Sequence, residues 1–293
     1  MSLFIMATYP VEGGATLEGP VTPNTDGTVS VDGSPIPACQ GTAALLAAAC
    51  QTSAHLGTAP PYALIAGDIG RGDGTRAAFK LLAEAVARAR PAVLVFHYMQ
   101  PIMTLMRHAL AELAEVCPDA LLVADAGGMY AAKAAGLASH FELMTPDVGE
   151  IGFLADPKAT HPAYVAHHLF GTSDFDPVQL SGIAYEEGGS SRVLLVKGER
   201  DYIVEAGTIA ATVEKPSVPA LEAIGGTGDT ITGLASALLA GGFAPVEAAI
   251  CAARANRAAG LAMHATPAMH AADLVEELPR VLEDKLERWR RHP

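Results

Sequence analysis

Residues 223–233 read Ala-Ile-Gly-Gly-Thr-Gly-Asp-Thr-Ile-Thr-Gly, a glycine-rich turn and one carboxylate at the start of a strongly patterned helix. Behind the turn, apolar residues recur with helical spacing at Ile231, Leu234, Ala235, Leu238 and Leu239. Asp229 lies off that apolar face, so we expect its carboxylate to face the mouth of a pocket. The stretch predicts a phosphoryl-transfer site. An ordinary helix start, capped by Thr227 or Asp229, is the alternative.

The same turn offers backbone N–H groups to an anion. The first N–H groups of a helix have no partner within the helix. With those of Gly226, Thr227 and Gly228, they would form a positive concavity that suits a phosphate or a developing oxyanion. Glycine allows the close approach of the backbone that such binding needs.

Composition and charge narrow the class of protein. A chain of 293 residues that is 50% hydrophobic can bury a sizeable core, and no linker indicates a second domain. The formal charge of -13 argues against nucleic acid or an anionic membrane as a partner, because both need a basic surface. The four cysteines lack Cys-x-x-Cys spacing, and no apolar run could span a bilayer. We therefore expect a soluble, cytoplasmic protein with reduced thiols.

Strand and helix patterns alternate along most of the chain, which predicts an α/β fold with a mostly parallel sheet covered on both faces. The expected strands are 63–66, 92–96, 120–124, 141–144 and 192–197, with two short strands within 201–213. The expected helices are 41–56, 75–90, 102–116, 129–136, 148–155, 161–169, 176–187, 228–241, 245–264 and 271–289. We predict a single domain over 1–293, with a core at 41–290. Residues 1–40, rich in Gly, Pro and Thr, would form a hairpin or an irregular lid.

Ligands of open parallel sheets bind beyond the carboxyl ends of the strands, which selects four loops in this chain. The first contains Gly70 and Arg71, but its glycines do not have the Gly-x-Gly-x-x-Gly spacing of a dinucleotide site, and an ordinary glycine-rich turn fits as well. The second begins at Asp125, which ends a hydrophobic strand and could meet a substrate hydroxyl. A helix cap is the alternative for Asp125.

The third and fourth loops carry groups suited to metal and phosphate. Asp147 and Glu150 are three residues apart at a helix start, so both could organise a hydrated Mg²⁺. They could equally complement the helix dipole. Lys197, followed by Gly198, ends a buried strand and could reach a phosphate as a point charge. A solvated strand end is the alternative for Lys197.

Several motifs resemble those of a known superfamily. The stretch 223–233 and the following residues to 245 resemble the Gly-x-Gly-Asp signature of the ribokinase-like superfamily. The NAD(P)H-hydrate dehydratase branch carries motifs similar, in the same order, to residues 66–71, 125–126, 145–150, 196–198 and 225–233. The similarity extends over roughly residues 40 to 290. It implies a ribokinase-like three-layer α/β/α sandwich.

The resemblance also implies an activity and the roles of residues. Enzymes of this branch use ADP or ATP with Mg²⁺ to phosphorylate the hydroxyl of hydrated NADH or NADPH and then eliminate it. Carried over, Asp229 is the base and residues 226–228 are the anion hole. Lys197, Gly198 and Asn256 lie on the nucleotide side, and Glu150 organises the metal through water. The substrate-side residues would be Gly70, Arg71, Asp125 and Asp147.

The chain departs from the branch on the substrate side. Residues 1–40 show no clear equivalent of the usual opening strand and Gly-Ser-rich loop. Asp147 stands where the branch usually has histidine, Asp68 where it has glycine, and residues 219–222 where it has Asn-Pro-Gly-Met. A sugar or vitamin-precursor kinase on the same fold therefore stays open, as does a non-catalytic nucleotide-binding scaffold. Because a neighbouring subunit could supply the missing wall, we expect a homo-oligomer.

The histidines and the aromatic run at a strand end suggest less. His161, His167 and His168 lack metal-ligand spacing and are expected on the surface or in helix packing. Residues 96–99, Phe-His-Tyr-Met, could line the pocket, but such side chains at a strand end more often belong to the core.

Overall fold

The computed structural model describes residues 2–24, 27–36, 40–161 and 176–291. Its strands form one twisted sheet in the order β11-β10-β9-β8-β7-β6-β1-β5-β2-β3-β4. The parallel part comprises β1 (Leu3–Tyr9), β5 (Tyr62–Gly67), β6 (Val93–His97), β7 (Leu121–Ala124), β8 (Leu143–Met144) and β9 (Val193–Val196). Because these strands run the same way, their carboxyl ends meet at one edge.

Antiparallel strands complete both ends of the sheet. One end carries β10 (Asp201–Glu205) and β11 (Thr208–Val213), and the other carries β2 (Leu17–Pro23), β3 (Val29–Val31) and β4 (Ser34–Pro35). Proline is tolerated in edge strands, because its missing N–H can face away from the ladder. This tolerance fits Pro23 at the end of β2 and Pro35 in β4.

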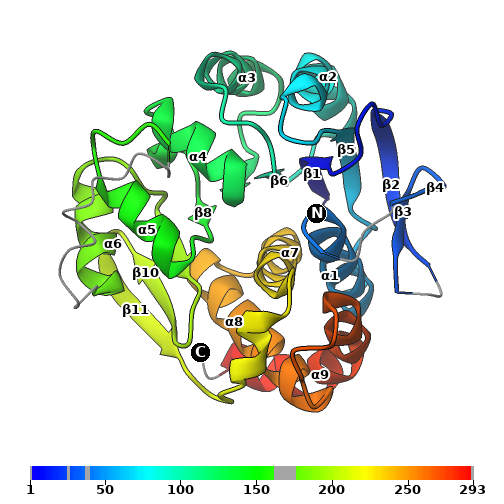
Figure 1. Ribbon diagram of the computed structural model, residues 1–293, viewed down its shortest axis with the longest axis vertical. Helices are drawn as coiled ribbons and strands as arrows, with labels where there is room; N and C mark the ends of the chain where they lie inside the picture. The colour runs from blue at the N-terminus through cyan, green and yellow to red at the C-terminus, as the bar shows by residue number, and fades with distance from the viewer. Residues whose placement is uncertain (1, 25–26, 37–39, 162–175, 292–293) are drawn as a thin grey trace.

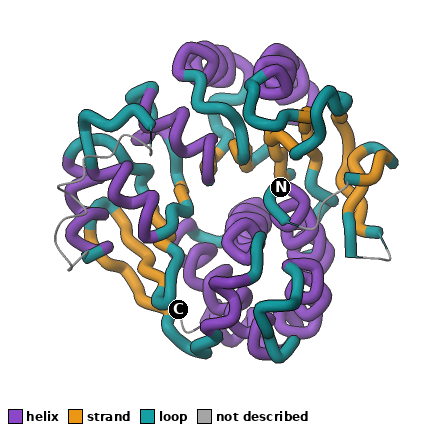
Figure 2. Tube along the Cα trace, viewed as in Figure 1, coloured by secondary structure: helices purple, strands orange, loops and turns teal. Residues whose placement is uncertain are grey.

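Helices cover both faces of the sheet (Figures 1 and 2). One face carries α2 (Asp73–Ala89), α3 (Met103–Val116), α4 (Ala126–Ala134), α5 (Val148–Ala155) and α6 (Pro177–Glu186). The other carries α1 (Thr42–His55), α7 (Thr227–Ala240), α8 (Pro245–Ala262) and α9 (Ala271–Arg291). Short 3-10 turns lie at Ala138–His140 and Pro219–Ala223. This three-layer arrangement confirms the predicted fold class.

Strand β1 shows how the sheet serves two cores. Leu3, Ile5 and Ala7 pack into the core under α1 and α7–α9, whereas Phe4 and Met6 pack into the core under α2–α6. Side chains of a strand alternate between its faces, so a strand buried on both sides reads as a continuous apolar run. Within the described residues, no helix combines the length and apolar character needed to cross a bilayer.

The expected elements from residue 41 onward match the structure, with boundary shifts of a few residues. The expected helix at 161–169 is the exception, because it falls almost wholly on residues 162–175, outside the described residues. His167 and His168 lie there too. The assignment of the whole chain to a single domain stays a prediction.

The expectation for residues 1–40 is wrong in one respect. Strand β1 lies between β5 and β6 in the parallel part of the sheet, so the core begins at Leu3 and not at residue 41. The apolar run of β1 by itself is typical of a buried strand, but the many turn-forming residues that follow it favoured an irregular segment. The remainder does contain the expected hairpin, formed by β2 and β3.

Helix α7 is enclosed more completely than its pattern predicts. Its polar residues Thr230, Thr232 and Ser236 are as fully buried as its apolar face. Gly233 explains one close contact, because a Cβ at this position would lie 2.3 Å from the carbonyl oxygen of Leu45 in α1. Glycine therefore lets α7 pack directly against the backbone of α1.

Candidate active site

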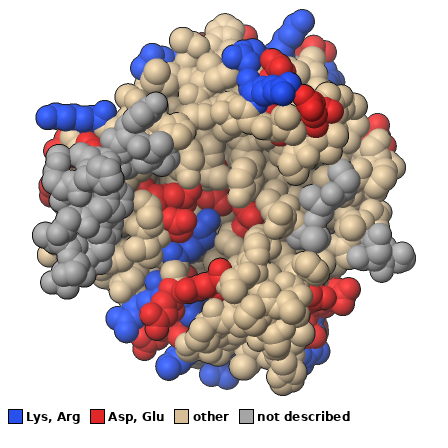
Figure 3. Space-filling model, viewed as in Figure 1, with Lys and Arg blue, Asp and Glu red and all other residues tan. Residues whose placement is uncertain are grey.

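A cavity of about 640 Å³ opens at the carboxyl ends of β6, β7, β8 and β9, between the starts of α5 and α7. Figure 3 shows it as a central hollow in which acidic and basic side chains meet. The titratable side chains that line it are Tyr98, Asp125, Asp147, Glu150, Lys197, Glu199, Asp201, Glu222, Asp229 and Arg257. The strand ends place all of these groups around one space.

Asp229 lies in the first turn of α7 and is paired with a histidine. Its Oδ1 atom is 3.0 Å from Nε2 of His97, the last residue of β6. The His97 side chain is fully buried, and its ring contacts Tyr98 edge-on at 4.5 Å between centroids. Burial, with the charges of Asp229 and Asp125 nearby, raises the pKa of Tyr98 to about 12. Tyr98 is therefore a neutral phenol beside the Asp229–His97 pair.

Asp125 and Lys197 form a second buried pair beside the first. The Lys197 ammonium lies 3.1 Å and 3.2 Å from the two carboxylate oxygens of Asp125. Thr232 donates to Asp125 Oδ2 at 2.6 Å, and its own oxygen lies 2.8 Å from that of Thr145. Burial acts against an ionised Asp125, but Lys197 and His97 outweigh it and hold the pKa of Asp125 below its usual range.

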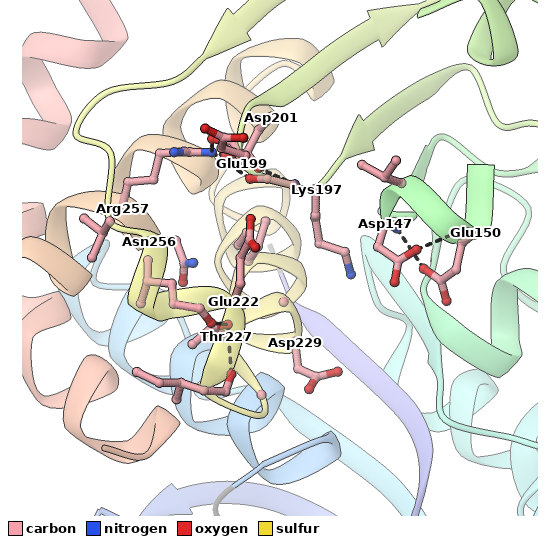
Figure 4. Close-up of a pocket in the computed structure, with 18 of the residues that line it drawn as sticks. Asp147, Glu150, Lys197, Glu199, Asp201, Glu222, Thr227, Asp229, Asn256 and Arg257 are labelled. Atoms are coloured by element: carbon pink, nitrogen blue, oxygen red, sulfur yellow. Dashed lines mark hydrogen bonds and ion pairs between the residues drawn. The ribbon is translucent and has the colours of Figure 1, made fainter. Parts of the chain in front are cut away.

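The pKa of Lys197 is raised, in the opposite direction to that of Asp125. Burial alone would lower it, but the carboxylates of Asp125, Glu150 and Asp229 raise it well above its usual range. The lysine is therefore a permanent cation in the cavity. Figure 4 shows its side chain extending between Asp229 and the start of α5.

Asp147 and Glu150 form a capping box at the start of α5. The Glu150 N–H donates to Asp147 Oδ1 at 2.7 Å, and the Asp147 N–H donates to Glu150 Oε2 at 2.8 Å. The hydroxyl of Tyr130 donates to the other oxygen of Glu150. Burial raises the pKa of Glu150 despite the nearby Lys197. The helix-dipole alternative thus describes part of what these acids do, although both also line the cavity.

The glycine-rich turn before α7 has a left-handed residue and no side-chain cap. Gly226 precedes α7 with φ 98°, a left-handed value that favours glycine. No side chain caps this helix start, and the single hydrogen of the Thr227 hydroxyl is instead shared between the carbonyl oxygens of Leu221 and Ile224, at 2.9 Å and 3.1 Å. The capped-helix alternative is therefore wrong, and residues 226–228 line the cavity without a capping side chain.

Asn256 and Arg257 approach the cavity from α8. Asn256 Oδ1 accepts from the Thr230 hydroxyl at 2.6 Å, which ties α8 to the first turn of α7. Arg257 donates to Asp201 at 2.6 Å and to the carbonyl oxygens of Gly198 and Glu199, both at 2.9 Å. Arg257 therefore holds the turn between β9 and β10 as a wall of the cavity.

The structure brings most predicted site residues together but leaves two outside. The cavity lining includes the predicted Asp125, Asp147, Glu150, Lys197, Gly198, Gly226, Thr227, Gly228, Asp229 and Asn256. Gly70 and Arg71 are absent from it. Their N–H groups bind the Asp68 carboxylate, each at 2.9 Å, and the Arg71 guanidinium pairs with exposed Glu12 at 2.6 Å. The roles assigned to all these residues stay predictions.

Several residues at the site were not among the predicted site residues, including His97, Tyr98, Thr232 and Arg257. The sequence offered the run 96–99 as a possible pocket lining but favoured the core, whereas Tyr98 lines the cavity and buried His97 contacts Asp229. Thr232 and Arg257 had no signal in the sequence, because the first looks like an ordinary helix residue and the second like a surface cation. Both are buried.

The donor set suits a hydrated Mg²⁺ near Glu150. Mg²⁺ prefers oxygen ligands and usually keeps several waters, and both Asp147 and Glu150 present carboxylates to the cavity. Their capping hydrogen bonds leave them better placed to hold coordinated water than to bind the ion directly. His97, Asp125 and Asp229 also lie within 4.8 Å of one another, but the Lys197 ammonium already neutralises Asp125.

Comparison with known structures defines the class of this fold. Phosphofructokinase-2 of Escherichia coli, in a crystal structure with potassium, matches with a TM-score of 0.58 and 15% identity. The match covers 96% of this chain and 99% of that one. The fold is therefore ribokinase-like, as predicted.

Comparison of sequences identifies the family. Residues 101–280 match the carbohydrate kinase family described as NAD(P)H-hydrate dehydratase. An uncharacterized protein of Methanocaldococcus jannaschii is 35% identical over 220 residues, which are 75% of this chain and 90% of that one. The ADP-dependent (S)-NAD(P)H-hydrate dehydratase of Cenarchaeum symbiosum is 30% identical over 180 residues, covering 58% of this chain and 55% of that one. The chain belongs to the NAD(P)H-hydrate dehydratase family.

Proposed function

We propose that this protein is an ADP- or ATP-dependent NAD(P)H-hydrate dehydratase. The observation that carries the proposal is the position of Asp229, which lines the cavity from the first turn of α7, directly after an uncapped glycine-rich turn. A carboxylate beside backbone N–H groups can take a proton from a hydroxyl where a phosphoryl group is held. Family membership and the ADP-dependent relative support the choice of substrate and nucleotide.

The reaction starts with proton transfer. Asp229 accepts the proton of the substrate hydroxyl, and the freed oxygen attacks the terminal phosphoryl group of the nucleotide. The N–H groups of residues 226–228 stabilise charge on that group as it moves. The bond from carbon to the phosphorylated oxygen then breaks, the neighbouring ring carbon loses a proton to solvent as the double bond forms, and inorganic phosphate departs. The products are NAD(P)H, phosphate and a nucleotide one phosphate shorter.

The other cavity residues position the reactants. Asn256 and Gly198 would lie beside the nucleotide, while Asp125 and Asp147 would face the hydrated nicotinamide. Mg²⁺, when bound, would neutralise phosphate charge, and Glu150 would hold it through water. Lys197 would add a permanent positive charge between the two sides.

The test is the recovery of the reduced-nicotinamide absorbance from hydrated NADH or NADPH with ADP or ATP and Mg²⁺. Asp229→Asn should lower kcat by about 10² to 10⁴, the usual range for loss of a general base, with nucleotide binding retained. Asp284→Asn on the exposed side of α9 is the matched control and should behave as wild type. A fully active Asp229→Asn variant would remove the base from the mechanism.

One observation keeps a small-molecule kinase as the second candidate. Among the described residues, seven carboxylates and two cations line the cavity, and both cations are already ion-paired with carboxylates. This excess of negative charge is a demanding environment for a substrate with phosphates of its own. If no nicotinamide absorbance returns while a small alcohol stimulates ATP consumption, the protein is a small-molecule kinase. If nucleotide binds and neither reaction occurs, the protein is a binding scaffold.

A further inference from the structure

The His97 side chain is held from both ends in the interior, in a position that the proposed chemistry does not by itself explain. Its Nε2 atom is 3.0 Å from Asp229 Oδ1 and 3.8 Å from Asp125 Oδ2. Its Nδ1 atom is 3.3 Å from the hydroxyl oxygen of Thr42, at the start of α1. The ring is fully buried, so no solvent competes for either nitrogen.

The hydrogen-bond chain determines the proton on Nδ1. The Thr42 hydroxyl has one hydrogen, and it is directed to the carbonyl oxygen of Thr8 at 2.6 Å. Toward His97, the same oxygen can therefore only accept. The Nδ1 atom must carry a hydrogen to bond with it.

The proton on Nε2 follows from the carboxylates. If Nε2 carried no hydrogen, its lone pair would face Asp229 Oδ1 at 3.0 Å, an arrangement that needs a protonated Asp229. Imidazole is the more basic of the two groups, so a proton shared between them resides on the ring. The charged groups that surround the ring are Asp229, Asp125 and the Lys197 bound to Asp125, with neutral Tyr98 against its face. A cationic ring makes this buried group electrically neutral, whereas a neutral ring between ionised carboxylates would leave one negative charge uncompensated.

We infer that His97 is an imidazolium that positions Asp229, holding its Oδ1 atom and leaving Oδ2 as the oxygen that meets the substrate hydroxyl. The inference rests on the proposed function for its kinetic consequence but not for the charge state of the ring. His97 acts through Asp229 and does not touch the reacting atoms. Thr8, Thr42 and His97 thus connect the backbone of β1 to the base in α7.

The charge state can be measured without any turnover. In protein labelled with ¹⁵N-histidine, His97→Gln identifies the His97 signals among the ten histidines of the chain. We expect both ring nitrogens of His97 to show the shifts of protonated nitrogen at pH 7.5. In Asp229→Asn the ring should become neutral and keep its hydrogen on Nδ1, because Thr42 still only accepts. A neutral His97 ring in the wild-type protein at pH 7.5 overturns the inference.

The kinetic arm separates positioning from folding. His97→Leu should lower kcat by about 10- to 100-fold, with KM little changed, because the interaction matters only once the base acts. In His97→Gln the side-chain amide can still donate to Asp229 but carries no charge. It should recover most of kcat, with the acid limb of the pH profile moved to higher pH. His108→Gln, on an exposed histidine, is the control.

The outcomes of the two arms are distinct. Wild-type kcat and an unchanged pH profile in both His97 variants would overturn the positioning role. If the wild-type protein itself turns over no hydrated nicotinamide, the proposed function fails, while the ¹⁵N spectra still decide the state of His97. If His97→Leu does not fold, His97→Gln and the spectra carry the test.

Discussion

Asp125 makes contacts with three elements at once. It caps α4 by accepting from the Ala126 N–H at 2.9 Å, and it binds the Lys197 ammonium that follows β9. It also accepts from Thr232 of α7. The sequence left two roles open for Asp125, a helix cap and a group that meets a substrate hydroxyl. These roles are compatible, because a carboxylate has two oxygens and several lone pairs.

Asp125→Asn tests this network through stability. Asp125 is almost fully buried and its pKa is held below the usual range, so its ionised form stabilises the folded state. That contribution is complete above the unfolded pKa of about 3.9 and is lost as pH falls through the lower folded value. Removing the charge leaves Lys197 without its partner, at a cost of about 3 kcal/mol at neutral pH.

Urea unfolding between pH 3 and pH 7 measures this effect. The wild-type free energy of unfolding should fall more steeply with acid than that of Asp125→Asn, so the two curves converge at low pH. Asp284→Asn should parallel the wild type. Curves for Asp125→Asn and wild type that stay parallel across this range would contradict the assignment.

At the scale of elements, the contact between α7 and α1 positions the residues of the site. The first turn of α7 holds Asp229, and α1 begins at Thr42, which contacts His97. At Gly233, α7 closely approaches the backbone of α1 at Leu45. Asp229 is therefore positioned by its own helix and by the close packing of that helix against α1.

Gly233→Ala should separate these helices. The added methyl would lie 2.3 Å from the Leu45 carbonyl oxygen, so the backbone must shift, and overpacking of this kind costs about 1 to 3 kcal/mol. Gly182→Ala in α6 is the matched control, because among the described residues its methyl would meet one backbone atom, at 3.7 Å. That change should be neutral or stabilising by about 0.5 to 1 kcal/mol. Thermal or urea unfolding measures both, and an equally stable Gly233→Ala variant would disprove the close packing.

At the scale of the whole molecule, two halves of the chain meet at the cavity. Figure 1 shows α4 and α5 on one side and α7 and α8 on the other, with strand ends between them. A ligand that binds in this cavity binds only the folded state, because unfolding separates the segments that line the cavity. Ligand binding should therefore raise the free energy of unfolding of the protein.

ADP or ATP with Mg²⁺ should raise the Tm, by an amount equivalent to about 2.7 kcal/mol at a hundredfold excess over Kd. In Gly228→Ala the shift should shrink. The methyl would lie 3.5 Å from Lys197 Nζ, an ordinary contact that spares the fold but occupies space beside the glycine turn. Gly182→Ala should keep the full shift. An unchanged Tm of the wild-type protein at saturating nucleotide and Mg²⁺ would contradict a phosphate site at the start of α7.

The sequence by itself determined the α/β class, most helices and strands, and the position of the site at the carboxyl ends of the parallel strands. It could do so because helical spacing, apolar runs and strand-end loops are local patterns, and parallel strand ends must meet at one edge. Asp125, Asp147, Lys197 and Asp229 were all found in this way.

Only the tertiary structure decided the partners of these residues. The pairing of His97 with Asp229, separated by 132 positions, depends on which strand lies beside which helix. The place of β1 inside the sheet and the exclusion of Gly70 and Arg71 from the cavity depend on the same packing. No local pattern encodes such contacts, because distances between remote segments are set only when the sheet and its two helical layers assemble.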